Sequence, residues 1–177
     1  MKSIPLTEAR STIFIGELLS GTKETQPRVY ATFLGGPLVV TGLSKDEITY
    51  MKQVKYTGIC DGQKPLILFF DYVAPEVPGS MFAQLIPGGA DRIIHGVGVK
   101  EVDAKESVVR VNCGCNEYKA WYGEANSEAD VQYGIRLKRI DARDYGYKKA
   151  EVNTLKIPGL CRHLISLYSH LKKINKI

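Results

Sequence analysis

The fold of this chain depends on two short stretches, Val108-Val109-Arg110-Val111-Asn112-Cys113-Gly114-Cys115 and Ile157-Pro158-Gly159-Leu160-Cys161-Arg162-His163-Leu164. The first stretch ends in Cys-x-Cys, and the second, far downstream, contains Cys-x-His. Thiolates and imidazole are preferred ligands of Zn²⁺, and a structural zinc takes four of them in a tetrahedron. The sequence therefore predicts a closed metal clamp that ties a β-strand to the last helix, with Cys113, Cys115, Cys161 and His163 as ligands.

The local geometry predicted around the four ligands agrees with such a clamp. Residues 96–103 and 106–113 are predicted to form a hairpin, and alternation places Val109, Val111 and Cys113 on one face of its second strand. Cys115 continues that face if the chain stays extended. Side chains two apart diverge on a regular helix. We therefore expect Cys161 in the turn that leads into the helix and His163 on its first turn.

A plainer interpretation is that the three clustered cysteines pack as small apolar side chains and that His163 is a satisfied histidine. The four cysteines of the chain do not form a disulfide framework, because Cys113 and Cys115 are too close for easy bridging. Cys60 stands apart from the other three, and we expect it to be a small buried residue.

Catalysis is not indicated by the sequence. Cys60 with His95 or His170 would be a nucleophile and a base, but no local signature supports that pairing. A zinc with four protein ligands has no open position for water, so the expected metal is structural. We therefore expect a protein that is not an enzyme.

Length and composition are those of an ordinary soluble globular protein. The chain has 177 residues, of which 44% are hydrophobic and 24% charged. No apolar run is long enough for a membrane span, and the N-terminus has no secretion signal. We expect a single domain over 1–177, with an N-terminal α/β segment over 1–65 and a sheet plus zinc-binding region over 66–177.

The first part of the chain predicts a mixture of helices and strands. Ser44-Lys45-Asp46-Glu47 is a capping box, Asp61-Gly62 is a hairpin-turn signal, and five apolar residues at 66–70 indicate a strand near the sheet centre. Residues 73–95, rich in Pro and Gly, predict a long loop. The other predicted elements are a helix over 6–21, a loop over 22–27, strands over 28–34 and 38–41, a helix over 44–52, a strand over 53–59 and a strand over 66–72.

The second part of the chain ends in the clearest helical signal. Leu164, Leu167, Tyr168, Leu171 and Ile174 form one apolar face of a helix predicted over 160–173. Before it come a turn or short helix over 116–122 and a possible strand over 132–140. The predicted fold class is α+β: a mainly antiparallel β-sheet core with a zinc-clamped C-terminal helix and a short N-terminal helix.

Positive charge gathers in the C-terminal third. The whole chain has a net charge of +5, and residues 130–177 hold 11 Lys and Arg against 4 Asp and Glu. Such a segment is either a solvated face or a surface for nucleic acid or an acidic protein. The residues that would contact phosphates and bases are Arg136, Lys138, Arg139, Arg143, Lys148 and Lys149, with Tyr133, Tyr145 and Tyr147 between them.

The ligand pattern resembles a known family. Cys113-Gly114-Cys115 followed by Cys161-Arg162-His163 resembles the SWIM zinc finger, in which Cys-x-Cys and Cys-x-His are separated by a variable gap. The surroundings are similar to those of SWIM-like proteins encoded by tailed bacteriophages, over roughly residues 66–171. The residues that carry this similarity are Val109 to Cys115, Tyr118, Ala125-Asn126, Asn153, Pro158 to Leu164 and the upstream strand at Leu68-Phe69-Phe70-Asp71-Tyr72.

The resemblance implies a function and a location. It implies a structural zinc and a non-enzymatic component of a tailed-phage virion, in the neck, tail or baseplate, made in the bacterial host cytoplasm. Its partners would be other virion proteins in a symmetric assembly, without a membrane. SWIM modules also occur in proteins that act on DNA, so the alternative is nucleic-acid binding through the basic C-terminal third.

Overall fold

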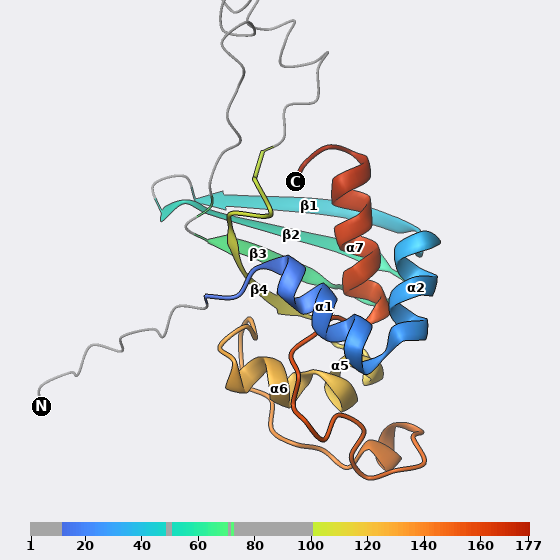
Figure 1. Cartoon of the computed structure of the whole chain (residues 1–177). Coiled ribbons are helices and arrows are strands. Elements are labelled where there is room, and N and C mark those ends of the chain that lie inside the picture. The colour runs from blue at the N-terminus through green and yellow to red at the C-terminus, as the bar shows by residue number, and fades with distance from the viewer. Residues whose placement is uncertain (1–11, 49–50, 71, 73–100) are drawn as a thin grey trace, which may run out of the picture.

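The structure of the protein is a computed structural model that describes residues 12–48, 51–70, 72 and 101–177 (Figure 1). The loop predicted over 73–95 lies outside these residues, as does most of the first strand of the predicted hairpin. The described helices are α1 (Ile15–Thr25), α2 (Pro27–Gly35), α5 (Asn116–Trp121), α6 (Gly123–Glu128), the 3₁₀ helix η2 (Ala142–Tyr145) and α7 (Arg162–Lys173).

Within the described residues, four antiparallel strands form one sheet in chain order: β1 (Val40–Ile48), β2 (Gln53–Cys60), β3 (Leu66–Phe70) and β4 (Val108–Asn112). Asp61 and Gly62 both have positive φ, which confirms the tight turn predicted between β2 and β3. The inner position of β3 agrees with the prediction from its apolar run. The predicted α+β class with an antiparallel sheet is confirmed.

One face of the sheet forms the core. Figure 1 shows α7 lying across the strands, with α1 and α2 on the same side. Alternate residues of each strand point at these helices because the side-chain period of a strand is two. The fully or almost fully buried strand side chains include Val54, Tyr56, Cys60, Ile67, Phe69, Val109 and Val111.

Helix α7 confirms the helix predicted over 160–173, although it begins two residues later than predicted. Leu164, Leu167 and Leu171 have no exposed surface, Tyr168 is half-buried, and Ile174 follows the last turn with 40% of its surface exposed. The apolar face read from the sequence is thus the face that packs on the sheet. Its burial places the first turn of the helix, and with it His163, beside the end of β4.

The outer edge of β4 is covered by two short extended segments. Ile13 accepts a hydrogen bond from the backbone N–H of Val109 at 2.9 Å. Farther along, the N–H of Val111 donates to Val131 at 2.8 Å, and the N–H of Tyr133 donates to Val111 at 2.9 Å. Pairing of this kind satisfies backbone groups that an open edge would leave free.

The N-terminal elements correct three predictions. Residues 28–34, predicted as a strand, lie in helix α2, where Pro27 occupies the first turn. Val29, Tyr30 and Phe33 then share one side that packs against the core. The loop predicted over 22–27 is wrong, since α1 continues to Thr25, and within the described residues the helix predicted over 6–21 begins only at Ile15.

Three further predictions differ from the structure. The capping box at 44–47 does not open a helix; these residues belong to β1 and pair with β2. The strand predicted over 132–140 is reduced to one bridge between Gln132 and Val111. Residues 101–103 are not a strand, so the described part of the predicted hairpin contains β4 alone.

Candidate metal centre

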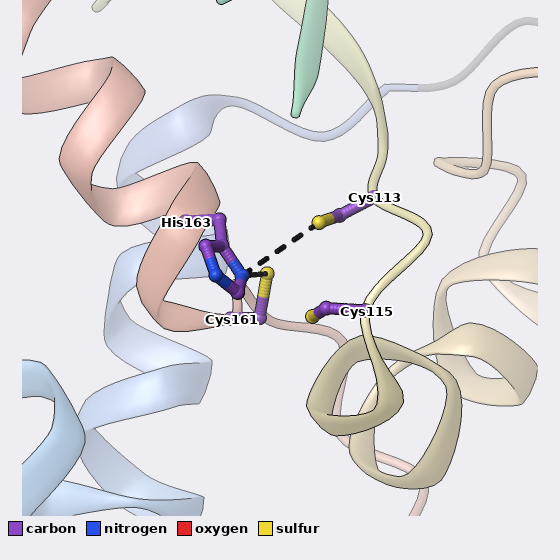
Figure 2. A group of neighbouring side chains, drawn as sticks. All are labelled: Cys113, Cys115, Cys161 and His163. Carbon is purple, nitrogen blue, oxygen red and sulfur yellow. Dashed lines mark hydrogen bonds between the residues drawn. The ribbon is translucent and has the colours of Figure 1, made fainter. Parts of the chain in front are cut away.

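The four predicted ligands meet at one point between β4 and α7. Cys113, Cys115, Cys161 and His163 are all buried, and their ligand atoms lie within 4.8 Å of one another. Figure 2 shows the three sulfur atoms and the imidazole pointing toward a common centre. The sequence prediction that these residues come together is confirmed, and the cluster could bind a metal ion.

The first ligand pair is placed by the end of β4 and the start of α5. Cys113 continues the buried face of Val109 and Val111 and is 1% exposed. Cys115 is the N-cap residue of α5, and its Sγ accepts the backbone N–H of Tyr118 at 3.2 Å. That N–H has no partner within the helix, so the sulfur caps the start of α5.

The second ligand pair is placed by the start of α7. Cys161 is the N-cap residue with extended backbone, and His163 lies in the first turn. The imidazole Nδ1 lies 3.9 Å from Cys113 Sγ and 4.0 Å from Cys161 Sγ (Figure 2). Nδ1 is therefore the nitrogen that faces the thiols.

The size and chemistry of the cluster fit a tetrahedral ion. Zn–S and Zn–N bonds of about 2.3 and 2.0 Å place neighbouring ligand atoms roughly 3.5–3.8 Å apart in a tetrahedron. The Nδ1–Sγ distances of 3.9 and 4.0 Å are close to that value. Three sulfurs and one nitrogen form a set that favours Zn²⁺ over Mg²⁺ or Ca²⁺, which prefer oxygen. The donor set and its spacing thus suit a zinc ion.

The three thiols do not ionise independently. The hydrogen bond between the Cys113 and Cys115 thiols raises the pKa of Cys113 to about 12. Burial raises the pKa of Cys161 well above its usual range. Hydrogen bonds with the Cys113 and Cys161 thiols lower the pKa of Cys115. Because zinc binds thiolates, binding of a divalent ion would release protons from thiols with a raised pKa.

Buried polar side chains hold the segment that leads to Cys161. Asn126 forms two hydrogen bonds with Gly159, accepting from its N–H at 3.0 Å and donating to its carbonyl at 2.9 Å. On the other side, Thr22 Oγ1 accepts the N–H of Leu160 at 2.7 Å. The extended segment before α7 is therefore fixed from both α6 and α1, which sets the position of Cys161.

A second buried network supports the first ligand pair. The Tyr118 hydroxyl donates to Gln132 Oε1 at 2.5 Å and accepts from Asn126 Nδ2 at 3.1 Å. Tyr118 is fully buried, and burial raises its pKa far above the usual range. The network connects α5, α6 and the segment beside β4, so it holds the elements around Cys113 and Cys115 together.

A pocket of about 480 Å³ opens beside the cluster. It lies between α2, the turn after β2, α5 and the start of α7, and Cys115 and His163 form part of its wall. Glu117 is the carboxylate nearest to the ligands in sequence; burial raises its pKa, while the N–H of Arg162 lowers it. The other residues lining the pocket include Val29, Phe33, Asp61, Gln63, Tyr147 and Arg162.

Sequence reasoning did not find Glu117, Thr22 or Gln132 as parts of the site. The one sequence signal that could have indicated Glu117 is its position two residues after the predicted ligand Cys115. The sequence predicts a loop at Thr22 and a strand at Gln132, so the local pattern gives no basis for their contacts with the clamp. Tyr118 and Asn126 carry part of the family resemblance, and both lie in the buried network.

The other candidate residues lie away from the ligand cluster. Cys60 is buried at the end of β2, as expected for a small core residue, and does not join the cluster found among the described residues. His95 lies outside the described part of the chain, and His170 lies on α7.

The six basic residues predicted to contact nucleic acid are exposed, and three of them form ion pairs with nearby carboxylates. Arg136 pairs with Asp130 at 2.5 Å, Arg139 with Glu151 at 2.7 Å, and Arg143 with Asp141 at 2.5 Å. These ion pairs reduce the net positive field of the segment. Lys138, Lys148 and Lys149 are exposed as well.

Comparisons with known proteins return no relative: no protein-family model, no curated protein and no solved structure matches the chain. The similarity to SWIM-like phage proteins therefore stays a prediction. Among the helices that the structure describes, none has the length and apolar character needed to cross a membrane.

Proposed function

We propose that this protein is a non-enzymatic structural component of a tailed-phage virion, located in the neck, tail or baseplate, and that a structural Zn²⁺ fastens its fold. The observation that carries the zinc part is the buried meeting of three thiols and one imidazole within 4.8 Å. Four protein ligands fill a tetrahedral zinc, so the ion would stabilise the fold and would not activate water.

The position of the ligands explains what a zinc would contribute. They join the end of β4 to the start of α7 and so close the long segment over 116–160, which contains only short helices. Closing a long segment costs conformational entropy, and the binding free energy of the ion would offset that cost. The metal would therefore set the stability of this segment more than that of the sheet.

The virion part of the proposal is supported by the family resemblance and by exposed apolar side chains. Ile135 and Leu155 lie on the segment that the clamp closes and expose 86% and 77% of their surface, and Val39 exposes 79%. Apolar groups of this kind would be buried by neighbouring proteins in a symmetric assembly.

Elemental analysis tests the zinc. We expect the purified chain to contain one equivalent of zinc and Cys113→Ser and Cys161→Ser to lose it. Both variants should also lose stability, because each leaves an incomplete ligand set. Cys60→Ser is the matched control, since it changes a buried cysteine outside the cluster. Unchanged zinc content in both ligand variants would refute the site.

Particle purification tests the virion role. The protein should co-purify with assembled phage particles at a fixed copy number per particle after density-gradient separation. Its absence from particles that contain their other structural proteins would contradict the proposed location without affecting the zinc site.

Nucleic-acid binding is the second candidate, favoured by the exposure of six basic side chains at 136–149. Its mark is a steep loss of affinity as salt rises, because counterions are released from the phosphates. Reversing Lys138, Lys148 and Lys149 to Glu should abolish such binding. Failure of single- and double-stranded DNA to bind at low salt would remove this candidate.

A further inference from the structure

Two buried polar atoms beside the clamp have no hydrogen-bond partner among the described residues, His163 Nε2 and Glu117 Oε1. Leaving buried polar atoms unpaired destabilises a fold, so the presence of two in one region needs an explanation. The two are chemically complementary. If a metal takes Nδ1, the neutral imidazole carries its proton on Nε2 and is a donor, whereas a carboxylate oxygen is an acceptor.

The fold brings the two side chains to the same place. Glu117 lies in the first turn of α5, two residues after Cys115. Its Oε2 accepts the backbone N–H of Arg162 at 3.3 Å, and Arg162 directly precedes His163. Glu117 and His163 also line the same pocket. One carboxylate oxygen thus anchors Glu117 to the start of α7, and the other has no hydrogen-bond partner in the described part of the chain.

We propose that Glu117 is a positioning residue of the metal centre, whose Oε1 accepts a hydrogen bond from His163 Nε2–H, either directly or through one water in the pocket. This inference rests on the proposed zinc site and deepens it. A ligating histidine commonly donates its second N–H to a carboxylate, which fixes the ring orientation and strengthens it as a ligand. Here the carboxylate would hold Nδ1 toward the three sulfurs.

The other carboxylate of the pocket is less suited to this role. Asp61 lies in the turn after β2, its side chain is 64% exposed, and it pairs with Arg162 at 3.7 Å. The Arg162 guanidinium also lies near enough to Glu117 to interact with its charge. Zinc with three thiolates and a neutral imidazole carries one net negative charge, so this guanidinium offsets the further negative charge of Glu117.

Two variants distinguish a role of Glu117 toward His163 from its role as a cap of α7, in which it accepts the N–H of Arg162. In Glu117→Gln, the amide oxygen can still accept from Arg162, but the amide NH₂ then meets the imidazole N–H as a second donor. Glu117→Ala removes both contacts. We expect a 10- to 100-fold loss of Zn²⁺ affinity in both, measured by chelator competition on the full chain. Glu106→Gln, an exposed carboxylate before β4, should keep the wild-type affinity.

Two further measurements keep the inference falsifiable. Nitrogen-15 NMR of the zinc-loaded wild type should show His163 protonated at Nε2, with slow exchange of that proton, and the slow exchange should disappear in Glu117→Ala. The unfolding free energy of the metal-free variants reports the helix cap alone. Wild-type zinc affinity in both variants, or a ring protonated at Nδ1, would overturn the role of Glu117. Failure of the wild type itself to bind zinc would instead overturn the proposed function.

Discussion

Glu101 connects three parts of the chain through a single carboxylate. It accepts a hydrogen bond from the Tyr56 hydroxyl on β2 at 2.6 Å and pairs with Lys45 on β1 at 2.9 Å. Lys176, in the tail after α7, completes the set. The backbone N–H of Glu101 also donates to the Lys176 carbonyl at 2.9 Å. One side chain thus fastens the end of the chain to the sheet.

The first prediction concerns the charge of Glu101. Burial alone would raise its pKa, but hydrogen bonds from Lys176, Tyr56 and Lys45 outweigh burial and lower it to about 2. A folded pKa below the unfolded value of about 4.5 means that the stabilisation is complete above pH 4.5 and disappears as pH falls toward 2. Glu101→Gln should therefore lower the free energy of unfolding by about 2–3 kcal/mol at pH 7.

Urea unfolding of the wild type and of Glu101→Gln checks this prediction. The difference between them should shrink between pH 5 and pH 3, since the wild-type carboxylate loses its advantage there. Comparing the two proteins at each pH cancels the loss of a bound metal that acid would cause in both. An equal difference at pH 7 and pH 3 would show that the carboxylate acts through shape and not through charge.

The metal centre shows, residue by residue, what the sequence could and could not reveal. Cys113, Cys115, Cys161 and His163 could be found because residue type and spacing alone supply four ligands, whatever the fold between them. Glu117 could not be assigned its contact, because its oxygen meets the Arg162 N–H only after α5 folds against α7. Each ligand pair is local in sequence, whereas the contacts that support it join elements that are far apart in the chain.

At the scale of elements, α7 and β2 could be predicted because periodicity and burial agree. The leucines of α7 recur every three to four residues, and β2 buries every second side chain. The sequence predicts a strand in place of helix α2 because Val29, Ala31 and Phe33 alternate, yet Val29, Tyr30 and Phe33 also fit one helix face. Packing of that face on the core decides in favour of the helix, and packing is not visible in a nine-residue segment.

Strand β1 was misassigned for the opposite reason. Its segment at 44–47 has the residue types of a helix start but no apolar face that a following helix could bury. Pairing with β2 satisfies its backbone, and its charges form ion pairs on the sheet, such as Lys55 with Asp46 at 3.0 Å. A capping signal is weak when an adjacent strand offers a full ladder of hydrogen bonds.

The second prediction concerns the contact of α1 with the segment before Cys161. A Cβ at Gly21 would lie 2.0 Å from the Pro158 carbonyl oxygen, a backbone atom that cannot move aside. Replacing Gly by Ala inside a helix normally stabilises by about 0.5–1 kcal/mol. Gly21→Ala should instead destabilise by about 2 kcal/mol or more, because it pushes α1 away from Pro158.

Gly16→Ala is the matched control in the same helix, since nothing lies within 4 Å of its Cβ position. It should show the ordinary stabilisation in thermal and urea unfolding. If Gly21→Ala proved as stable as Gly16→Ala, the close packing of α1 on Pro158 would be wrong.

At the scale of the whole molecule, the chain combines a sheet core with a long segment over 116–160 whose helices are all short. Three antiparallel pairings and the face of α7 hold the sheet without any ligand residue. The segment over 116–160 is held to the rest of the chain by the ligand cluster, by the hydrogen bonds of Leu160 with Thr22 and of Val111 with Val131, and by core side chains such as Tyr118 and Tyr122. Its two ends are both ligand positions, so a bound metal would govern its opening.

The last prediction follows from this division. Removing zinc with a chelator should increase amide hydrogen exchange within 116–160 by about 100-fold, equivalent to about 2.7 kcal/mol, because local opening no longer breaks metal bonds. Amides of β2 and β3 should change by less than about tenfold, since their ladder and the α7 face remain. Adding zinc back should restore protection, and Cys113→Ser should exchange like the chelated wild type with or without zinc. Equal loss of protection in the sheet and in 116–160 would mean that the metal supports the fold as a whole.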